Sequence, residues 1–358
     1  MPSDHRSSAV PDLSGRRVLV PGGTGGVGEG VVRRYLAAGA DVVVPTRSER
    51  RAQEFREVLG AAATDRLHLV VHDYTSFAGA EHLAAEVERN LGGIDDVVTP
   101  IGGFLAGHRL WEVDESEWRS AFVELSTAHA AVMRACVPRL SRSGAYVVIV
   151  GESAVEPVPT AGLVSMEQSA LLMMQRVLNA ELDDAKRVFA LVLGPIRTRM
   201  AVDGGPDLVS ADQVGEVAVT ASASTAAGQE IRLRDQAEFD RAVTLLREGA
   251  PTDADTVATM STMHPKPGRG RELLALLGEL APQIRAEPGC LRYSVHPTRD
   301  DADGPVLILM EFTSTEAFTA HSARVARQVP RIAELLHTPP TPPALFGPDV
   351  SGGALLPA

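Results

Sequence analysis

The 358-residue sequence predicts an α/β doubly wound parallel sheet followed by a smaller α+β ferredoxin-like domain. Short apolar runs alternate with helical patterns over residues 13–235, as in a parallel sheet covered by helices on both faces. From residue 256 the order changes to strand, helix, strand, strand, helix, which begins a ferredoxin-like sandwich. This change in the order of strands and helices predicts a domain boundary between the two parts.

The elements of the first unit follow one another with short connections. Strands are expected at residues 17–20, 41–44, 67–71, 95–98, 146–150, 188–193 and 230–233. Helices are expected at residues 29–38, 50–59, 81–91, 115–140, 165–182 and 211–220. A continuous run such as Val42, Val43 and Val44 is typical of a strand buried on both faces.

The second unit is expected to span residues 256–338. Its strands are predicted at 257–263, 290–296 and 306–312, and its helices at 271–287 and 315–336, the latter broken near Pro330. Three segments lie outside the two domains in this prediction: a disordered leader (1–12), a helix and linker (236–255) and a Pro/Gly-rich tail (339–358) that is partly disordered.

Charge and composition exclude several classes of function. The net charge of −12 provides no basic field for nucleic acid. No apolar run reaches membrane-spanning length and the leader has no signal-peptide pattern, so we expect a cytoplasmic protein that does not bind membranes. The two cysteines, Cys136 and Cys290, form neither a disulfide framework nor a zinc pattern. A small molecule is therefore the expected partner, and no metal is expected.

A glycine-rich loop at residues 21–28 joins the first strand to the first helix. Gly22 permits a tight turn, Gly26 allows backbone to approach a pyrophosphate, and Gly28 allows the helix to pack on the strand. The alternative is a glycine-rich loop without a ligand. Here residues 13–233 resemble short-chain dehydrogenases/reductases, whose Thr-Gly-x-x-x-Gly-x-Gly fingerprint matches except that Pro21 replaces the Thr. The resemblance implies a Rossmann fold and a nicotinamide cofactor.

The end of the second strand indicates which nicotinamide cofactor is used. Thr46 stands where an acid would select NAD, and Arg47 could pair with a 2′-phosphate, so NADP(H) is favoured. A solvated arginine is the alternative, and Asp73 is either the family's adenine-contacting acid or a turn aspartate. The expected cofactor-binding set is Gly22, Gly26, Val27, Gly28, Arg47, Ser48, Asp73, Gly102 and Thr198.

The catalytic residues of the family are missing from this sequence. The resemblance places its Tyr at Val164, its Lys at Gln168, its Ser at Gly151 and its Asn at Leu125. Valine cannot transfer a proton, and glutamine carries no charge to lower a tyrosine pKa. Tyr–Lys catalysis is therefore not expected, and the NADP site is either a working site or a remnant. Ser153 and His129 are candidate replacements.

Residues 259–336 resemble the antibiotic-biosynthesis monooxygenase family. The resemblance rests on three segments: residues 267–268 (Pro-Gly), 285–293 (Arg-Ala-Glu-Pro-Gly-Cys-Leu-Arg-Tyr) and 311–321 (Glu-Phe-Thr-Ser-Thr-Glu-Ala-Phe-Thr-Ala-His). It implies a dimeric α/β barrel type of fold and oxidation of aromatic polyketide intermediates by O₂ without metal or flavin. Haem degradation is not expected, because this unit has neither Asn nor Trp.

The candidate catalytic residues of the whole chain are His321, Tyr293, His296 and Ser153. A cofactor-free oxygenase needs a base that makes an electron-rich phenolate, which His321 could supply. The alternatives are purely structural roles: His321 packs against or caps a helix, and Tyr293 belongs to the core.

Three functions follow from these patterns. The first is cofactor-independent monooxygenase chemistry in aromatic polyketide tailoring, with an NADP-binding or scaffold first unit. The alternatives are an atypical NADPH-dependent ketone or quinone reductase and a non-catalytic binding or assembly protein. Under each, both resemblances imply a homo-oligomer, either a dimer or a tetramer.

Overall fold

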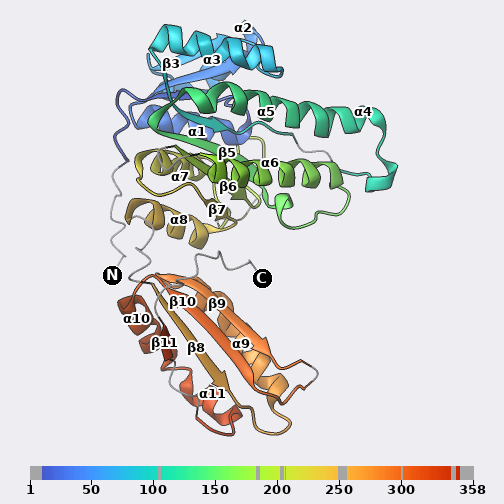
Figure 1. Cartoon of the computed structure of the whole chain (residues 1–358), viewed down its shortest axis with the longest axis vertical. Helices are drawn as coiled ribbons and strands as arrows, with labels where there is room; N and C mark the ends of the chain where they lie inside the picture. The colour runs from blue at the N-terminus through green and yellow to red at the C-terminus, as the bar shows by residue number, and fades with distance from the viewer. Residues whose placement is uncertain are drawn as a thin grey trace. The chain divides into compact units, whose positions relative to one another are not determined.

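The computed structural model divides the chain into two compact units, one ending at Arg247 and the other beginning at Glu248 (Figure 1). It describes residues 10–103, 106–182, 186–201, 205, 207–248, 256–299, 301–339 and 344–346. The expected linker at 249–255 and most of the expected leader lie outside these residues. Within the described ranges no helix combines the length and apolar character needed to cross a membrane.

The first unit is built on one parallel sheet of seven strands in the order β3-β2-β1-β4-β5-β6-β7. The strands are β1 (Arg17–Leu19), β2 (Asp41–Thr46), β3 (Leu67–Val71), β4 (Ile94–Thr99), β5 (Leu140–Gly151), β6 (Arg187–Leu193) and β7 (Glu230–Leu233). The strand order reverses between β1 and β4, which is where such sheets bind ligands at their carboxyl ends. The predicted doubly wound Rossmann fold is therefore confirmed.

Helices bury the two faces of this sheet in two separate apolar cores (Figure 1). One core takes side chains from α1 (Gly26–Ala37), α2 (Glu49–Leu59), α7 (Ala211–Ala223) and α8 (Gln236–Glu248). The other takes side chains from α3 (Phe77–Leu91), α5 (Leu125–Cys136) and α6 (Gly162–Glu181). Helix α8 was expected outside the first domain, but its Ala242, Val243 and Leu246 are buried in the first core.

The long helix expected at residues 115–140 is interrupted. It consists of α4 (Glu115–Trp118), a π-helical segment (Arg119–Glu124) and α5, and a short 3₁₀ turn (Val137–Arg139) then leads into β5. A π-helical turn accommodates extra residues within a helix and is frequent near functional sites. Apolar periodicity alone does not reveal such an insertion.

Helices α1 and α7 touch through their backbones. A Cβ atom added to Gly30 would lie 2.2 Å from the carbonyl carbon and oxygen of Ala211, and one added to Gly215 would lie 2.4 Å from the Gly30 oxygen. The distance between packed helices is set by the side chains at the contact, so glycine at both positions permits this close approach.

The second unit is an antiparallel sheet in the order β11-β8-β10-β9. Its elements are β8 (Val257–Met263), α9 (Gly270–Arg285), β9 (Cys290–Pro297), β10 (Val306–Phe312), α10 (Thr315–Val325), α11 (Val329–Leu335) and β11 (Ala344–Phe346). The α+β ferredoxin-like prediction is confirmed, including the break near Pro330. Strand β11 corrects the expected tail, because it pairs with β8; the other residues from 340 onward lie outside the described part.

Candidate functional site

The glycine loop connects β1 to α1 at the carboxyl end of the sheet. Gly22 has a φ of +86°, and a Cβ there would lie 2.5 Å from the Pro100 oxygen at the end of β4. A Cβ on Gly28 would lie 2.4 Å from the Gly22 oxygen, so the first turn of α1 packs directly on the loop. No side chain caps the N-terminus of α1, whose N–H groups are available to an anion.

The segment after β6 brings Thr198 to this loop. A Cβ on Gly26 would lie 3.1 Å from Thr198 Oγ1, which accepts hydrogen bonds from the backbone N–H groups of Met200 and Ala201. The next residue, Arg199, forms a 2.9 Å ion pair with Glu29 of α1. Thr198 and Arg199 therefore hold this segment against the helix that would bind the pyrophosphate.

Arg47, Asp73 and the glycine loop meet at the ends of β2 and β3. The Asp73 carboxylate accepts hydrogen bonds from the Thr75 hydroxyl and N–H, which lower its pKa, and the nearby Arg47 charge lowers it further. Asp73 thus has a turn role, while Arg47 is exposed and makes no hydrogen bond with other described residues. Tyr74, which the sequence analysis missed, has its hydroxyl beside the Gly22 N–H.

The other residues expected to contact the cofactor are Ser48, Gly102 and Val27, and each has a different local environment. Ser48 caps α2, its Oγ accepting a hydrogen bond from Arg51 N at 3.3 Å. Gly102 is exposed and open, with no atom within 4 Å of an added Cβ. Val27 packs against the first core. Of these positions, only Gly102 faces open space.

Two positions of the missing catalytic residues, Gly151 and Gln168, meet at the end of β5. Gly151 N–H donates to Gln168 Oε1 at 2.5 Å, and Gln168 Nε2 donates to Glu167 Oε2 at 2.6 Å. A Cβ on Gly151 would lie 3.5 Å from Ser153 Oγ. Val164 is buried one turn before Gln168 on α6. None of these groups reproduces a Tyr–Lys pair.

Glu167 is a buried acid that the sequence analysis missed. It is 1 % exposed, and burial raises its pKa to about 7, against the lowering effect of the Gln168 hydrogen bond. Its Oε1 has no hydrogen-bond partner among the described residues. The sequence did carry a signal for its burial, because Glu167 lies on the same apolar face of the helix as Leu163 and Leu171.

His129 does not replace the missing proton donor. It is fully buried on α5, and its Nε2 bonds to the Ile101 carbonyl oxygen at 3.0 Å. Burial lowers its pKa to about 4, so it is a neutral core residue that holds the segment after β4.

In the second unit, His321 of α10 forms a buried pair with Glu287, which lies between α9 and β9. The distance from His321 Nδ1 to Glu287 Oε2 is 2.9 Å, and His321 is 4 % exposed. Arg324 also approaches this carboxylate, at 3.3 Å. The Phe312 and Phe318 rings have centroids 5.0 and 6.4 Å from the imidazole. The result is a carboxylate–histidine pair in an aromatic setting.

The other candidates of this unit lie on different faces of the sheet. Tyr293 is on the buried face, opposite Met310, and burial raises its pKa to about 12. His296 is exposed on the other face, because strand side chains alternate, and it bonds to Ser294 Oγ. The structure therefore does not bring His296 to His321.

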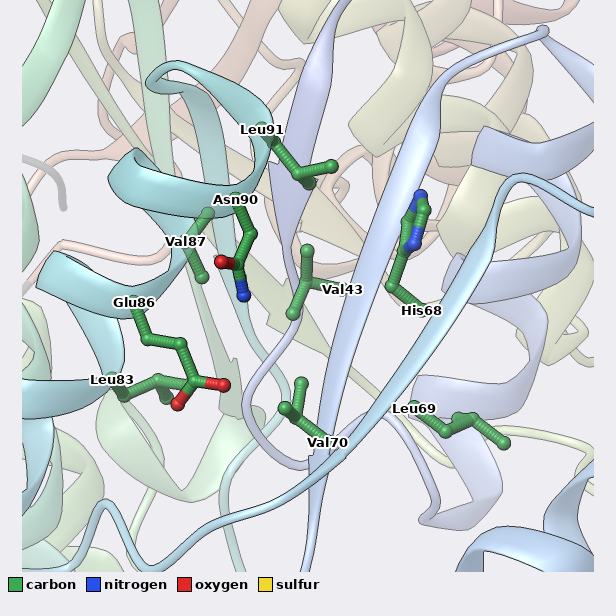
Figure 2. Close-up of a pocket in the computed structure, with 9 residues that line it drawn as sticks. All are labelled: Val43, His68, Leu69, Val70, Leu83, Glu86, Val87, Asn90 and Leu91. Carbon is green, nitrogen blue, oxygen red and sulfur yellow. The ribbon is translucent and has the colours of Figure 1, made fainter.

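Two hollows on the first unit differ in size. Figure 2 shows a small one of about 90 Å³ between the sheet and α3, lined by Val43, His68, Leu69, Val70, Leu83, Glu86, Val87, Asn90 and Leu91. It is too small for a dinucleotide or a drug-sized ligand. A groove of about 380 Å³ lies beside the start of α6, lined by Leu110, Val113, Asp114, Glu115, Trp118, Leu163 and Met166.

Comparison with known families agrees with this geometry. A family model described as enoyl-(acyl carrier protein) reductase matches residues 22–238, more than half of the chain. The chain belongs to the short-chain dehydrogenase/reductase family. A model described as antibiotic biosynthesis monooxygenase matches residues 256–328, so this short-chain dehydrogenase/reductase carries a second domain of that type. Both matches make the protein an oxidoreductase by family.

Individual relatives match a little over half of the chain. A hydroxysteroid 11-beta-dehydrogenase 1-like protein of Xenopus tropicalis is 29% identical over 57% of this chain and 73% of its own length. The mouse (Mus musculus) dehydrogenase/reductase SDR family member 4 is 30% identical over 53% and 68%. A Burkholderia cenocepacia short-chain dehydrogenase solved in complex with NADP has a TM-score of 0.56 at 22% identity, over 62% of this chain and 97% of its own, which shows a shared fold.

Proposed function

We propose that this oxidoreductase acts in tailoring aromatic, polyketide-type secondary metabolites, with cofactor-independent monooxygenase chemistry in the second unit. The observation that supports it is the buried His321–Glu287 pair beside Phe312 and Phe318. The first unit would bind NADP(H) or serve as a scaffold, because its glycine loop is intact while its proton relay is absent.

The pair provides a base for a phenolic substrate. Glu287 accepts the Nδ1–H bond and so fixes the tautomer, leaving the Nε2 lone pair to take a phenol proton. The resulting phenolate is electron-rich, and surrounding apolar side chains exclude water from it. A methylene para to the phenolate then reacts with O₂, becoming a carbonyl group with release of one water molecule.

Replacing His321 with glutamine is expected to slow O₂ consumption with a phenolic anthrone at least 100-fold, because a positioned base contributes about 10²–10⁴ in rate. Glu287→Gln should lower the rate less, since the imidazole remains. Oxygen-electrode rates, with thermal melting to check folding, measure both effects.

His296→Gln is the matched control, because His296 lies on the other face of the sheet. Its rate should equal that of the unmodified protein. Turnover that survives in a folded His321→Gln variant would rule out His321 as the base, and binding of the anthrone without turnover would favour the binding or assembly alternative.

The first unit fits NADPH better than NADH. The uncapped N-terminus of α1 would bind the pyrophosphate, and exposed Arg47 would hold the 2′-phosphate. When bound, the nicotinamide supplies a hydride. By the family resemblance, Thr198 would contact the nicotinamide end.

Arg47→Asp is expected to weaken NADPH binding about 30-fold or more, because an attractive charge becomes repulsive at the 2′-phosphate. NADH binding should change little, since NADH lacks that phosphate. Calorimetry with both nucleotides measures this difference. Equal losses for both nucleotides would contradict the assignment of Arg47, and no binding of either would leave the first unit as a scaffold.

An atypical NADPH-dependent ketone or quinone reductase is the second candidate. It is favoured by the intact glycine loop and by the polar groups that remain at the end of β5. NADPH oxidation that requires an added carbonyl compound and is lost in Arg47→Asp would support it over the oxygenase.

A further inference from the structure

The groove of about 380 Å³ beside the start of α6 combines apolar and acidic side chains. Its apolar lining includes Leu110, Trp118 and Met166, which are all exposed in the folded chain. Its charged lining consists of Asp114 and Glu115, and no lining residue within the described chain is basic. The volume falls within the range of small-molecule pockets, about 300–1,000 Å³.

The groove lies on a different side of α6 from the positions of the missing catalytic residues. Leu163 and Met166 line it, and because they are three residues apart they share one side of the helix. Val164 and Gln168 share another side, which faces the end of β5, where Gln168 bonds to Gly151. In a helix of 3.6 residues per turn, these two pairs point in nearly opposite directions. The groove is therefore separate from the place where the family carries its catalytic residues.

Trp118 presents an aromatic ring to the groove. The ring stacks on Phe122 with centroids 4.6 Å apart, which occupies one of its two faces. Trp111 has the Arg109 guanidinium 5.4 Å from its ring centroid, whereas no arginine or lysine of the described residues lies over Trp118. Since Trp118 is 39% exposed, its ring is accessible to a ligand. The negative face of an indole attracts cations.

Two carboxylates give the groove a negative charge at neutral pH. Asp114 caps α4, and its Oδ1 accepts a hydrogen bond from the Glu117 N–H at 2.9 Å. This bond and one from the Ser116 side chain lower the pKa of Asp114, so its carboxyl is ionised. Glu115 pairs with Arg119 at 3.5 Å, but both side chains are exposed and such pairs are weak. The charge and the aromatic ring together complement a positively charged ligand.

We propose that this groove binds an organic ammonium compound, with its charged nitrogen held by the Asp114 and Glu115 carboxylates and the Trp118 ring. The apolar body of the ligand would pack against Leu163 and Met166. An anion of the same shape would be repelled by the two carboxylates. The site goes beyond the functions proposed above, because it requires neither a bound nucleotide nor the chemistry of His321.

The test is an NMR titration of the full chain that follows the indole N–H signal of Trp118. The chain has two tryptophans, so Trp111→Phe leaves Trp118 as the only source of this signal. Benzyltrimethylammonium should shift the signal to saturation and bind about 5-fold or more tightly than phenylmethanesulfonate, an anion of similar shape.

Two substitutions, made in the Trp111→Phe chain, remove the charge without disturbing the fold. Asp114→Asn keeps a helix cap, and Glu115→Gln changes a highly exposed side chain. Each should weaken benzyltrimethylammonium binding about 2- to 5-fold, as expected for one exposed charge. Glu124→Gln is the control, because Glu124 is an exposed acid of the following π-helical segment that does not line the groove, and it should bind like the parent chain.

The proposal is overturned if benzyltrimethylammonium does not shift the Trp118 signal or if phenylmethanesulfonate binds as tightly. It is also overturned if both charge-removing variants bind like the parent chain. A Trp118 signal that changes with protein concentration in the absence of ligand, and that benzyltrimethylammonium leaves unaffected, would show instead that a second copy of the chain covers the groove.

Discussion

Gly30→Ala is expected to lower the free energy of unfolding of the first unit by about 3 kcal/mol or more, or to prevent its folding. The added Cβ would lie 2.2 Å from backbone atoms of Ala211, and a backbone contact cannot be relieved by rotating a side chain. Helices α1 and α7 would have to separate, which would also disturb the buried side chains around them. Urea unfolding followed by circular dichroism measures the loss.

Gly278→Ala is the control for the glycine substitution. Gly278 lies within α9, and an added Cβ meets no atom within 4 Å. Alanine is favoured over glycine in helices, so this variant should be about 0.5–1 kcal/mol more stable. If Gly30→Ala were equally harmless, the close contact between α1 and α7 would not exist in solution.

Glu167→Gln is expected to stabilise the protein above pH 7 by up to about 3 kcal/mol. Burial raises the pKa of Glu167 from its ordinary 4.5 to about 7, so the folded state holds a proton that the unfolded state releases between these values. Below pH 4.5 Glu167 is protonated in both states, so its ionisation does not affect the free energy of unfolding. Its penalty grows from pH 4.5 to 7 and is complete above pH 7. Glutamine cannot ionise and avoids that penalty.

Unfolding measured at pH 5 and pH 8 tests the substitution. The gain from Glu167→Gln should be large at pH 8 and small at pH 5. Glu115→Gln is the control, because the Glu115 side chain is 87% exposed, and it should show little pH-dependent change. An equal gain at both pH values would mean that Glu167 is not a buried ionising group.

Local patterns predicted most of the fold. The order of strands and helices, the glycine loop and the ferredoxin-like second unit depend on residues close together in sequence, and apolar periodicity reports them directly. Strand β11 was missed, because it lies in a Pro/Gly-rich segment and is held by pairing with β8, more than 80 residues earlier. The π-helical segment was missed because its residues keep a helical pattern.

The sites were predicted only in part. Family positions pointed to Gln168 and Gly151, which form a hydrogen bond in the structure. The partner of His321 was not foreseen, because Glu287 is 34 residues away and meets it only through packing of α10 against β10. His321 and His296 were both candidates, and strand alternation turns His296 to the face opposite Tyr293. Contacts between residues far apart in sequence can be predicted only when the three-dimensional arrangement is known.

The backbone contact between α1 and α7 constrains how a nucleotide could be admitted and released. Because Gly30 and Gly215 lock the two helices together, α1 cannot tilt to make room without carrying α7 with it. Side-chain contacts with Gly26 and Glu29 join the Thr198–Arg199 segment to α1. If a dinucleotide binds at this helix, the Arg199–Glu29 ion pair is a contact that can break locally while α1 stays in place.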